Sequence, residues 1–252
     1  MKISDSLVRD GSFLFRWRSY LPLVLLLPLV LALREAHHVE VAIGDRAHDI
    51  WVAFCYLISL SGLAVRALVV GLAAPGTSGR NVAEQRAESL NRTGLYSVVR
   101  HPLYLGNFLG IIGIVMSTMV WWFVALTALA YWLYIERIMA TEEGFLEGRF
   151  GEDFRAWAAR TPAFLPRFSG WVPSGRPFSF RTVLRREYNG VLAVAACFLV
   201  FEILLDVAVA GESLRDWIEE DMAWLIAFGL SALVFLSLRF LKKRTKMLNA
   251  AR

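Results

Sequence analysis

Cysteine is nearly absent from this chain. Cys55 and Cys197 are the only two among 252 residues, and both lie inside apolar runs. In that setting they are typical of small buried hydrophobic side chains, and no Cys-x-x-Cys or His-x-x-x-His spacing is present. The sequence therefore excludes a disulfide framework, and we expect no bound metal.

Charge is also scarce. Only 19% of the residues are charged and 57% are hydrophobic, which is too apolar for an ordinary soluble domain. The net charge of +5 could suggest nucleic acid, but the basic residues lie between hydrophobic segments and form no stripe with interleaved aromatic residues. This pattern favours a lipid bilayer as the partner and argues against nucleic acid.

Long apolar segments are abundant. Several approach the roughly 20 residues that a helix needs to cross the hydrocarbon core. They predict an all-α, polytopic transmembrane helical bundle with about six spans. The third and fourth segments are joined by almost nothing, so they must form an antiparallel hairpin that turns near Val120. The segments are 20–33, 50–72, 103–119, 121–135, 190–209 and 222–241.

The connections carry the orientation signal. Basic residues precede the first segment, fill the second connection, follow the fourth segment and follow the sixth, whereas the other connections are acidic or mixed. Because Lys and Arg collect in cytoplasmic loops, both termini are predicted to be cytoplasmic. Within the connections, 82–90 has a short helical pattern, and 136–189 begins as a helix that prolines later interrupt. The histidines of the first connection are expected in a solvated loop; they are His37, His38 and His48.

The hairpin brings polar groups together. Position 101 faces roughly position 139 across the turn, so Arg100 and His101 should lie within about two helical turns of Arg137 and the Glu142-Glu143 pair. Polar clusters at the mouth of an apolar bundle are candidates for function. The alternative is a set of interfacial salt bridges that anchors the hairpin. Arg66, inside the second segment, should snorkel to the surface or face a substrate groove.

Two motifs carry a family resemblance. Residues 93–107 read Thr-Gly-Leu-Tyr-Ser-Val-Val-Arg-His-Pro-Leu-Tyr-Leu-Gly-Asn, and residues 142–167 combine two glutamates, Phe150-Gly151, spaced aromatics and a closing proline pair. Both resemble the isoprenylcysteine carboxyl methyltransferase and phospholipid methyltransferase superfamily. The resemblance covers about 76–167 and suggests three parts: N-terminal membrane helices at 1–75, a methyltransferase core at 76–167, and a connection with two more spans at 168–252.

The resemblance implies an enzyme that uses S-adenosylmethionine to methylate a lipid or a lipidated acceptor through its phosphate, amine or carboxylate. It implies a bacterial inner membrane protein whose site faces the cytoplasm. The residues that would contact the acceptor or the reacting groups are Arg137, Glu142 and Arg100. The residues that match cofactor-binding positions are Gln85, Leu90, Tyr96, His101, Pro102, Leu103, Tyr104 and Glu143.

Two other functions are compatible with parts of the sequence. Membrane sterol and steroid reductases share a similar Arg-His-Pro-x-Tyr element and bind NADPH. In those relatives an acidic residue tends to follow the Tyr-x-Gly, where this chain has Asn107. The paired glutamates also favour the methyltransferases. The second alternative is a non-catalytic membrane scaffold, which the polar residues at the hairpin mouth argue against.

Overall fold

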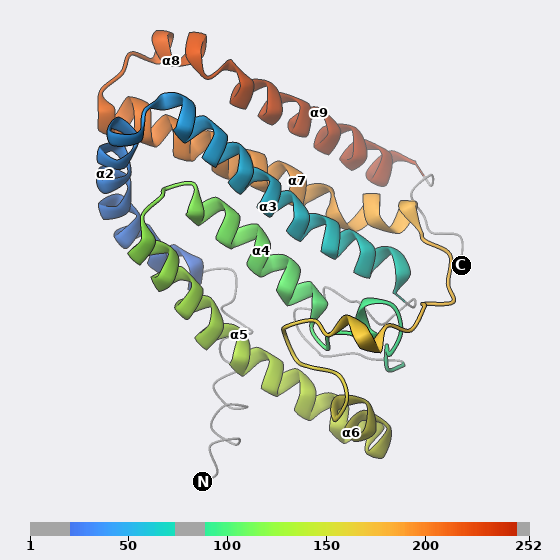
Figure 1. Ribbon diagram of the computed structural model, residues 1–252. Helices are drawn as coiled ribbons and strands as arrows, with labels where there is room; N and C mark the ends of the chain where they lie inside the picture. Colours follow the sequence, from blue (N-terminus) through green and yellow to red (C-terminus); the bar gives the residue numbers. More distant parts are fainter. Residues whose placement is uncertain (1–20, 74–88, 246–252) are drawn as a thin grey trace.

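A computed structural model describes residues 21–73 and 89–245, and within these ranges the chain forms helices and connections without a strand (Figure 1). Gln85, most of the 82–90 pattern and the basic residues before 21 and after 245 lie outside the described residues. The longer helices are α2 (Leu26–Ile43), α3 (Asp45–Leu72), α4 (Pro102–Met116), α5 (Trp121–Phe150), α6 (Glu152–Ala158), α7 (Phe180–Ile203), α8 (Leu214–Glu220) and α9 (Met222–Arg244). Shorter pieces are η1 (Leu21–Leu25), η2 (Leu95–Ser97), η3 (Phe168–Gly170) and a π-helical continuation of α7, η4 (Leu204–Ala210).

The helical membrane bundle predicted from the sequence is confirmed, and each of the apolar segments is helical. Four helices are long and apolar enough to cross a membrane: α3, α5, α7 with η4, and α9. Helix α4 is apolar but has only 15 residues. Helix α2 carries Arg34, Glu35 and Glu40 within its 18 residues. Four of the roughly six predicted spans are therefore long apolar helices, and the other two segments form shorter or more polar helices.

Helix α3 lies at the centre of the bundle and packs closely against α4 (Figure 1). Small residues allow this approach: a methyl group added at Gly113 would lie 2.3 Å from Ser59 Oγ, and one at Gly106 would lie 2.8 Å from the carbonyl oxygen of Gly62. Ser59 Oγ also donates a hydrogen bond to the carbonyl of Gly110 at 2.9 Å. Small side chains and cross-helix hydrogen bonds of this kind hold helices together inside membranes.

The first connection differs from its prediction. Helix α2 continues to Ile43, and Gly44, at a φ of 84°, alone separates it from α3. Glycine adopts this left-handed backbone without steric penalty. His48 is consequently buried in the first turns of α3, 3.2 Å from the Glu40 carboxylate. The expectation of a loop is therefore wrong for all three histidines, because the turn is a single residue: His37 and His38 lie in α2, and His48 is buried in α3.

Arg66 does not snorkel to the surface as expected. Its guanidinium forms a two-pronged ion pair with Glu187 of α7, at 2.8 and 3.0 Å, and donates to Asn107 Oδ1 of α4 at 2.5 Å. Both ionic side chains are largely buried. A charge inside an apolar bundle needs such partners, and this contact joins α3, α4 and α7 instead of reaching the surface.

The proline-rich segment after α6 returns to the core, and we call residues 159–179 the strap. As predicted, the chain here is helical through α5 and α6 and then irregular. Strap carbonyls of Pro162 and Ala163 accept from the backbone N–H groups of Arg100 and His101, at 2.8 and 3.1 Å. Further along, Gly94 N–H donates to Val172 at 2.8 Å. The strap therefore encloses the segment that leads into α4 (Figure 1).

Candidate functional site

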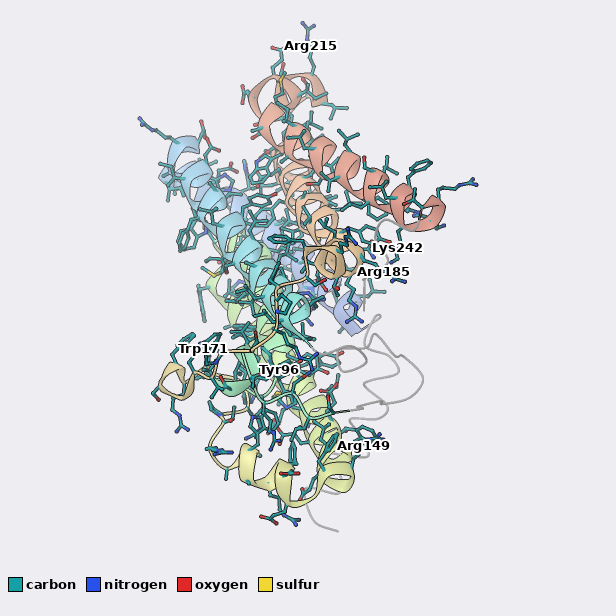
Figure 2. All side chains as sticks on the ribbon, turned by 90° about the vertical axis from the view of Figure 1, so that its right-hand side faces the viewer. Tyr96, Arg149, Trp171, Arg185, Arg215 and Lys242 are labelled. Atoms are coloured by element: carbon teal, nitrogen blue, oxygen red, sulfur yellow. The ribbon has the colours of Figure 1, made fainter. Side chains whose placement is uncertain are left out.

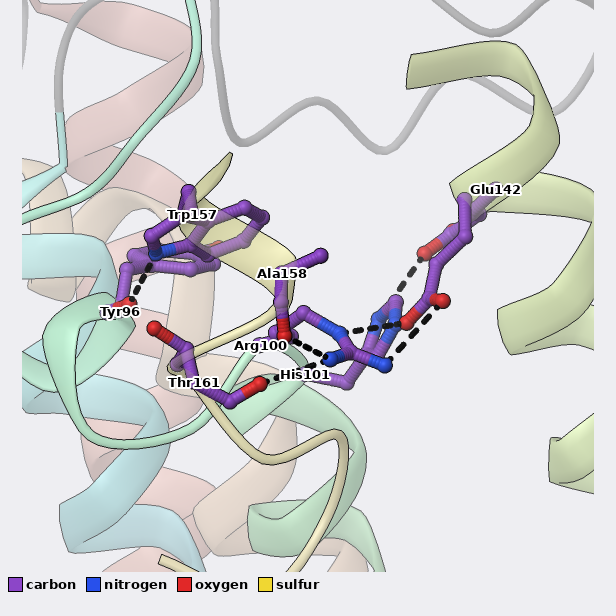
Figure 3. A network of polar contacts seen from close by, with 8 residues as sticks. Tyr96, Arg100, His101, Glu142, Trp157, Ala158 and Thr161 are labelled. Carbon is purple, nitrogen blue, oxygen red and sulfur yellow. Dashed lines mark hydrogen bonds and ion pairs between the residues drawn. The ribbon is translucent and has the colours of Figure 1, made fainter. Parts of the chain in front are cut away.

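The polar residues of both motifs meet at the open end of the α4–α5 hairpin (Figure 3). His101 is the residue before α4, and Pro102 occupies the first helical position, where its missing N–H and fixed φ cost nothing. Glu142 and Glu143 lie in the last third of α5. Helix α4 ends at Met116 and α5 begins at Trp121, which confirms the predicted hairpin and the proximity of Arg100 and His101 to the glutamate pair.

Glu143 is the centre of this network. Arg100 donates to both of its carboxylate oxygens, from Nε at 2.8 Å and from Nη2 at 3.2 Å. His101 Nε2 lies 2.8 Å from Oε1 of the same carboxylate. The remaining Arg100 nitrogen, Nη1, donates to the carbonyls of Ala158 and Thr161 at 2.8 and 2.7 Å. Most of the N–H donors of Arg100 therefore hold Glu143 and the end of α6 in place.

His101 lies between the two glutamates. Its side chain is only 6% exposed, and Nδ1 lies 3.6 Å from Glu142 Oε2 while Nε2 faces Glu143. Burial acts to lower the pKa of His101, but hydrogen bonds to Glu142 and Glu143 raise it above its ordinary value. The His101 ring also stacks on Tyr104, with centroids 5.7 Å apart and planes 25° from parallel. The histidine is therefore held as a charged or readily charged group.

Glu142 is the more accessible carboxylate of the pair. Its side chain is 30% exposed, and its Oε1 accepts a 2.5 Å hydrogen bond from the Tyr104 hydroxyl. The backbone of Tyr104 is fixed in turn, since its carbonyl accepts from Tyr131 Oη at 2.6 Å. Glu142 therefore combines a defined orientation with remaining capacity to accept hydrogen bonds from a ligand.

Tyr96 and Leu90 lie beside this network. The Tyr96 carbonyl accepts from Trp157 Nε1 at 3.1 Å (Figure 3). Burial, and then the nearby Glu142 charge, raise the pKa of the Tyr96 hydroxyl. Both residues line a cavity of about 300 Å³ between the end of α3 and segment 89–96. Pro102 and Leu103 form the first turn of α4, with Pro102 fully buried and Leu103 half-buried.

The structure does not bring Arg137 into the network. Its Nη1 donates to the carbonyl of Leu133 on its own helix at 2.5 Å. Successive residues of a helix are rotated by about 100°, so Arg137 is about 140° around α5 from Glu142. Arg137 and Glu142 therefore lie on different faces of α5, and the expected contact of Arg137 with the acceptor stays a prediction. Gln85 lies outside the described residues.

Some contributors to the site could not be read from the sequence. The carbonyls of Ala158 and Thr161 hold Arg100, and those of Pro162 and Ala163 hold the backbone before α4. Pro162 and Pro166 form the proline pair that closes the second motif, but no residue type identifies a backbone carbonyl as an acceptor. Their role depends on how the strap folds back.

Comparisons with known proteins identify the family. A phospholipid methyltransferase family model matches residues 52–153. The nickel-cobalt-cadmium resistance protein NccN of Alcaligenes xylosoxydans is 35% identical over 160 residues, 63% of this chain and 68% of that protein. The cobalt-zinc-cadmium resistance protein CzcN of Cupriavidus metallidurans is 41% identical over 88 residues, covering 35% of this chain and 40% of that protein. The protein-S-isoprenylcysteine O-methyltransferase of Schizosaccharomyces pombe is 30% identical over 73 residues, 29% of this chain and 31% of that protein.

The chain therefore belongs to the isoprenylcysteine carboxyl methyltransferase and phospholipid methyltransferase superfamily, and these matches indicate a membrane methyltransferase. The family match includes the whole α4–α5 hairpin and begins within α3, upstream of the predicted boundary at 76. No solved structure matches the chain. Among the residues that the structure describes, no group of three or more His, Cys, Asp or Glu side chains could hold a metal ion.

Proposed function

We propose that this protein transfers a methyl group from S-adenosylmethionine to a lipid or lipidated acceptor at the cytoplasmic face of the membrane. The observation that supports this most is the network at the mouth of the hairpin. An accessible carboxylate, Glu142, lies next to a stacked His101–Tyr104 pair, and Arg100 and Glu143 hold the surrounding backbone and side chains. Both halves of this network lie in the residues that carry the family resemblance.

The chemistry of these groups fits the cofactor. S-adenosylmethionine has an ammonium, which a partly exposed carboxylate such as Glu142 would bind. The face of an aromatic ring such as Tyr104 favours a nearby cation. Leu90, Leu103 and Tyr96 offer apolar and aromatic surface for the adenine. When bound, the cofactor supplies an electrophilic methyl group next to the acceptor.

The protein's own contribution is positioning and exclusion of water. In this proposal Arg100 and Glu143 are positioning residues, because their contacts are with each other, with His101 and with backbone carbonyls. A phosphate or carboxylate acceptor is already ionised and needs no base. An amine acceptor must lose a proton, and Glu142 is then the candidate base. The acceptor role that the resemblance gives Arg137 is a separate proposal, since its guanidinium lies outside the network.

The names of the two bacterial relatives describe resistance to metals and do not describe a reaction. Methylation of a membrane lipid changes the charge or the polarity of the bilayer surface. A methyltransferase could therefore influence such resistance through the membrane itself, and the proposal needs no metal to bind this chain.

Cofactor binding tests the proposal directly. Calorimetry on the full chain in detergent should show that S-adenosylmethionine binds and NADPH does not. Glu142→Gln should weaken cofactor affinity by about tenfold or more, because a hydrogen bond to a charged group contributes roughly 1.5–3 kcal/mol. Glu147→Gln, on the exposed surface of the same helix, should leave it unchanged. If the chain binds NADPH and not S-adenosylmethionine, the proposal is wrong and a reductase is favoured. If it binds neither cofactor, the result contradicts both enzyme classes.

The acceptor can be identified by its product. Membrane lipids incubated with the purified protein and methyl-labelled cofactor should gain one methyl group by mass spectrometry. Alkali identifies a carboxylate acceptor, because a carboxyl methyl ester is hydrolysed readily whereas a methylated amine or a methyl phosphodiester is stable. Absence of labelled lipid, with label on a membrane protein instead, would assign the acceptor to lipidated proteins.

A further inference from the structure

We propose that the strap, together with the first turn of α7, lies on the adjacent membrane surface and binds its anionic phospholipids. The partner is a lipid surface of negative charge, in which aromatic side chains enter the head-group layer and arginines contact phosphate groups. This inference goes beyond the proposed methyl transfer and does not depend on it. It rests on the charge, the burial and the position of residues 159–181.

Positive charge collects in this part of the chain. Between Asp153 and Glu187 the sequence has seven arginines and no acidic residue. Arg167 and Arg181 are exposed, and neither guanidinium has a carboxylate partner among the residues that the structure describes. Arg167 Nη2 donates to a backbone carbonyl, that of Arg160. Basic residues that stay unneutralised next to a spanning helix attract anionic lipids.

The aromatic side chains here form an inward and an outward set. Phe164 is buried, with its ring 5.5 Å from that of Trp132 between centroids, and Phe178 packs so closely on Gly71 of α3 that no side chain would fit there. The outward set is 68%, 47% and 72% exposed and consists of Phe168, Trp171 and Phe180. The inward set holds the strap on the bundle, so the outward set remains available to a partner. Exposed apolar side chains gathered in this way mark an interaction surface.

The strap also lies at the level of a membrane surface. At its end, Ser179 N–H donates to the carbonyl of Gly71 at 2.9 Å, in the last turn of α3. Helix α3 is long and apolar enough to cross the membrane, so its end marks the boundary of the hydrocarbon core. Figure 2 shows Trp171 at the side of the molecule, at a level between Arg185 at the start of α7 and Arg149 near the end of α5. Aromatic side chains at this depth anchor proteins in the head-group layer.

The membrane-facing residues also hold the backbone that leads into the network. Arg167 N–H donates to the carbonyl of Val98 at 2.9 Å. Val172, next to Trp171, donates its N–H to Ser97 Oγ at 2.9 Å. Residues 97 and 98 come shortly before the network residues of the first motif. Lipid bound by the strap should therefore order this segment as well.

A second copy of this chain is the main alternative partner for such a surface. Its strap carries the same positive charge, so two of these surfaces repel each other. Anionic phospholipids neutralise the arginines, and the head-group layer accepts aromatic rings. A lipid surface therefore matches both features, whereas a second copy matches only one.

Quenching from within the bilayer tests the position of the strap. The full chain would be placed in lipid nanodiscs with a fluorophore on Ser169→Cys, an exposed position of the strap. Ala156→Cys is the matched control, because it is exposed on α6, which lies farther from the spanning helices in Figure 1. Phospholipids spin-labelled near the head group should quench the label at 169 and iodide in solution should not, with the reverse result at 156. The unsubstituted chain gives the background from the native cysteines.

Lipid charge tests the arginines. In mixed nanodiscs, spin-labelled phosphatidylglycerol should quench the label at 169 more strongly than spin-labelled phosphatidylcholine at the same fraction. Arg167→Gln and Arg181→Gln should each lower this preference by up to about fivefold. Arg149→Gln should leave it unchanged, because this exposed arginine belongs to α5 and not to the strap.

Three results would overturn the inference. Quenching at 169 by iodide and not by lipid would place the strap in solution. Equal quenching by the two lipids, or an unchanged preference in the Arg167→Gln/Arg181→Gln double variant, would show that the arginines do not select anionic lipid. Self-quenching at 169 that requires two chains per nanodisc would assign the surface to a second copy. These measurements use no cofactor, so failure of S-adenosylmethionine binding would contradict the proposed function and leave the lipid surface standing.

Discussion

The Glu143 carboxylate illustrates how single residues organise this site. It accepts from Arg100 and faces His101, and both partners come from the segment just before α4. Breaking a buried ion pair by removing one partner leaves an unpaired charge and is strongly destabilising. The residues around Glu143 are therefore interdependent, and the charge state of His101 affects all of them.

The His101 imidazole should give the protein a characteristic pH dependence. Burial lowers its pKa, but the Glu142 and Glu143 hydrogen bonds raise it above the ordinary value of 6.5. A group whose pKa is raised on folding stabilises the folded state fully below its ordinary pKa, and this contribution is lost as the pH rises through the raised value. The midpoint of thermal unfolding should therefore fall as the pH rises above about 6.5, and this fall should be smaller in His101→Gln.

Tryptophan fluorescence melts in detergent, recorded from mildly acidic to mildly alkaline buffer, would measure this effect. His38→Gln is the matched control, because His38 is exposed on α2, a helix that contributes no residue to the network. Its melting curve should follow that of the wild type at each pH. Parallel curves for wild type and His101→Gln would show that the histidine carries no such coupling.

For single residues, the sequence predicted which side chains lie near one another better than which groups form hydrogen bonds. A hairpin with a four-residue turn has few alternatives, so the meeting of Arg100, His101 and the glutamates followed from counting residues. Arg137 lies at the same end of α5 and donates to the Leu133 carbonyl of its own helix, so its expected contact with the acceptor stays a prediction. The strap contacts of Arg100 were beyond prediction, since they involve backbone carbonyls.

At the scale of elements, the fit between α3 and α4 positions the site. The two helices approach so closely that glycine is required where one backbone faces the other. Arg66 then links both to α7 through Asn107 and Glu187. Since His101 directly precedes α4, any shift of this helix would move the network.

The glycines of α4 provide a matched pair of variants. A methyl group at Gly113 would lie 2.3 Å from Ser59 Oγ and 2.6 Å from the Cys55 carbonyl, whereas one at Gly110 would meet nothing within 4 Å. Gly113→Ala should destabilise the protein by about 1–3 kcal/mol through overpacking. Gly110→Ala should be neutral or stabilise it by up to about 1 kcal/mol, as alanine favours a helix over glycine.

Thermal unfolding in detergent, followed by circular dichroism, compares the two variants with the wild type. Equal midpoints for Gly113→Ala and Gly110→Ala would mean that the helices separate easily and that the close approach does not contribute to stability.

Hydrophobic segments predicted which parts of the chain are helical, but they did not predict where the helices end. Helix α2 continues through Arg34, Glu35 and Glu40, and α5 continues past Glu142 to Phe150. Apolar runs report the part of a helix that meets lipid, whereas the backbone can remain helical beyond it. Glu142 and Glu143 lie in such a polar extension, which the sequence predicted to begin as a helix.

The whole molecule has two chemically different ends. The end with the network also carries Arg181, Arg185 and the basic last turn of α9, while the opposite end carries Glu212 and Asp221. Burial, and then neighbouring carboxylates, raise the pKa of Asp221 to about 6. The predicted orientation places the basic end in the cytoplasm.

Cysteine labelling tests this orientation. The native cysteines lie within the bundle, Cys55 fully buried and Cys197 half-buried. In spheroplasts, an impermeant maleimide should therefore label Glu212→Cys directly and Thr245→Cys only after the membrane is opened. The unsubstituted chain provides the background. Labelling of both positions from the same side would reverse the predicted topology and with it the cytoplasmic placement of the site.

The shortness of α4 has a consequence for the bilayer itself. Fifteen residues rise only about 22 Å at 1.5 Å each, whereas the hydrocarbon core is about 30 Å thick. Local thinning of the membrane around the helix is one way to relieve this hydrophobic mismatch. His101, at the start of α4, would then lie at the depth where a lipid's head group joins its tails. Under the proposed function, an acceptor lipid would be methylated without leaving its leaflet, and turnover should be faster in bilayers of short-chain lipids than in thick ones.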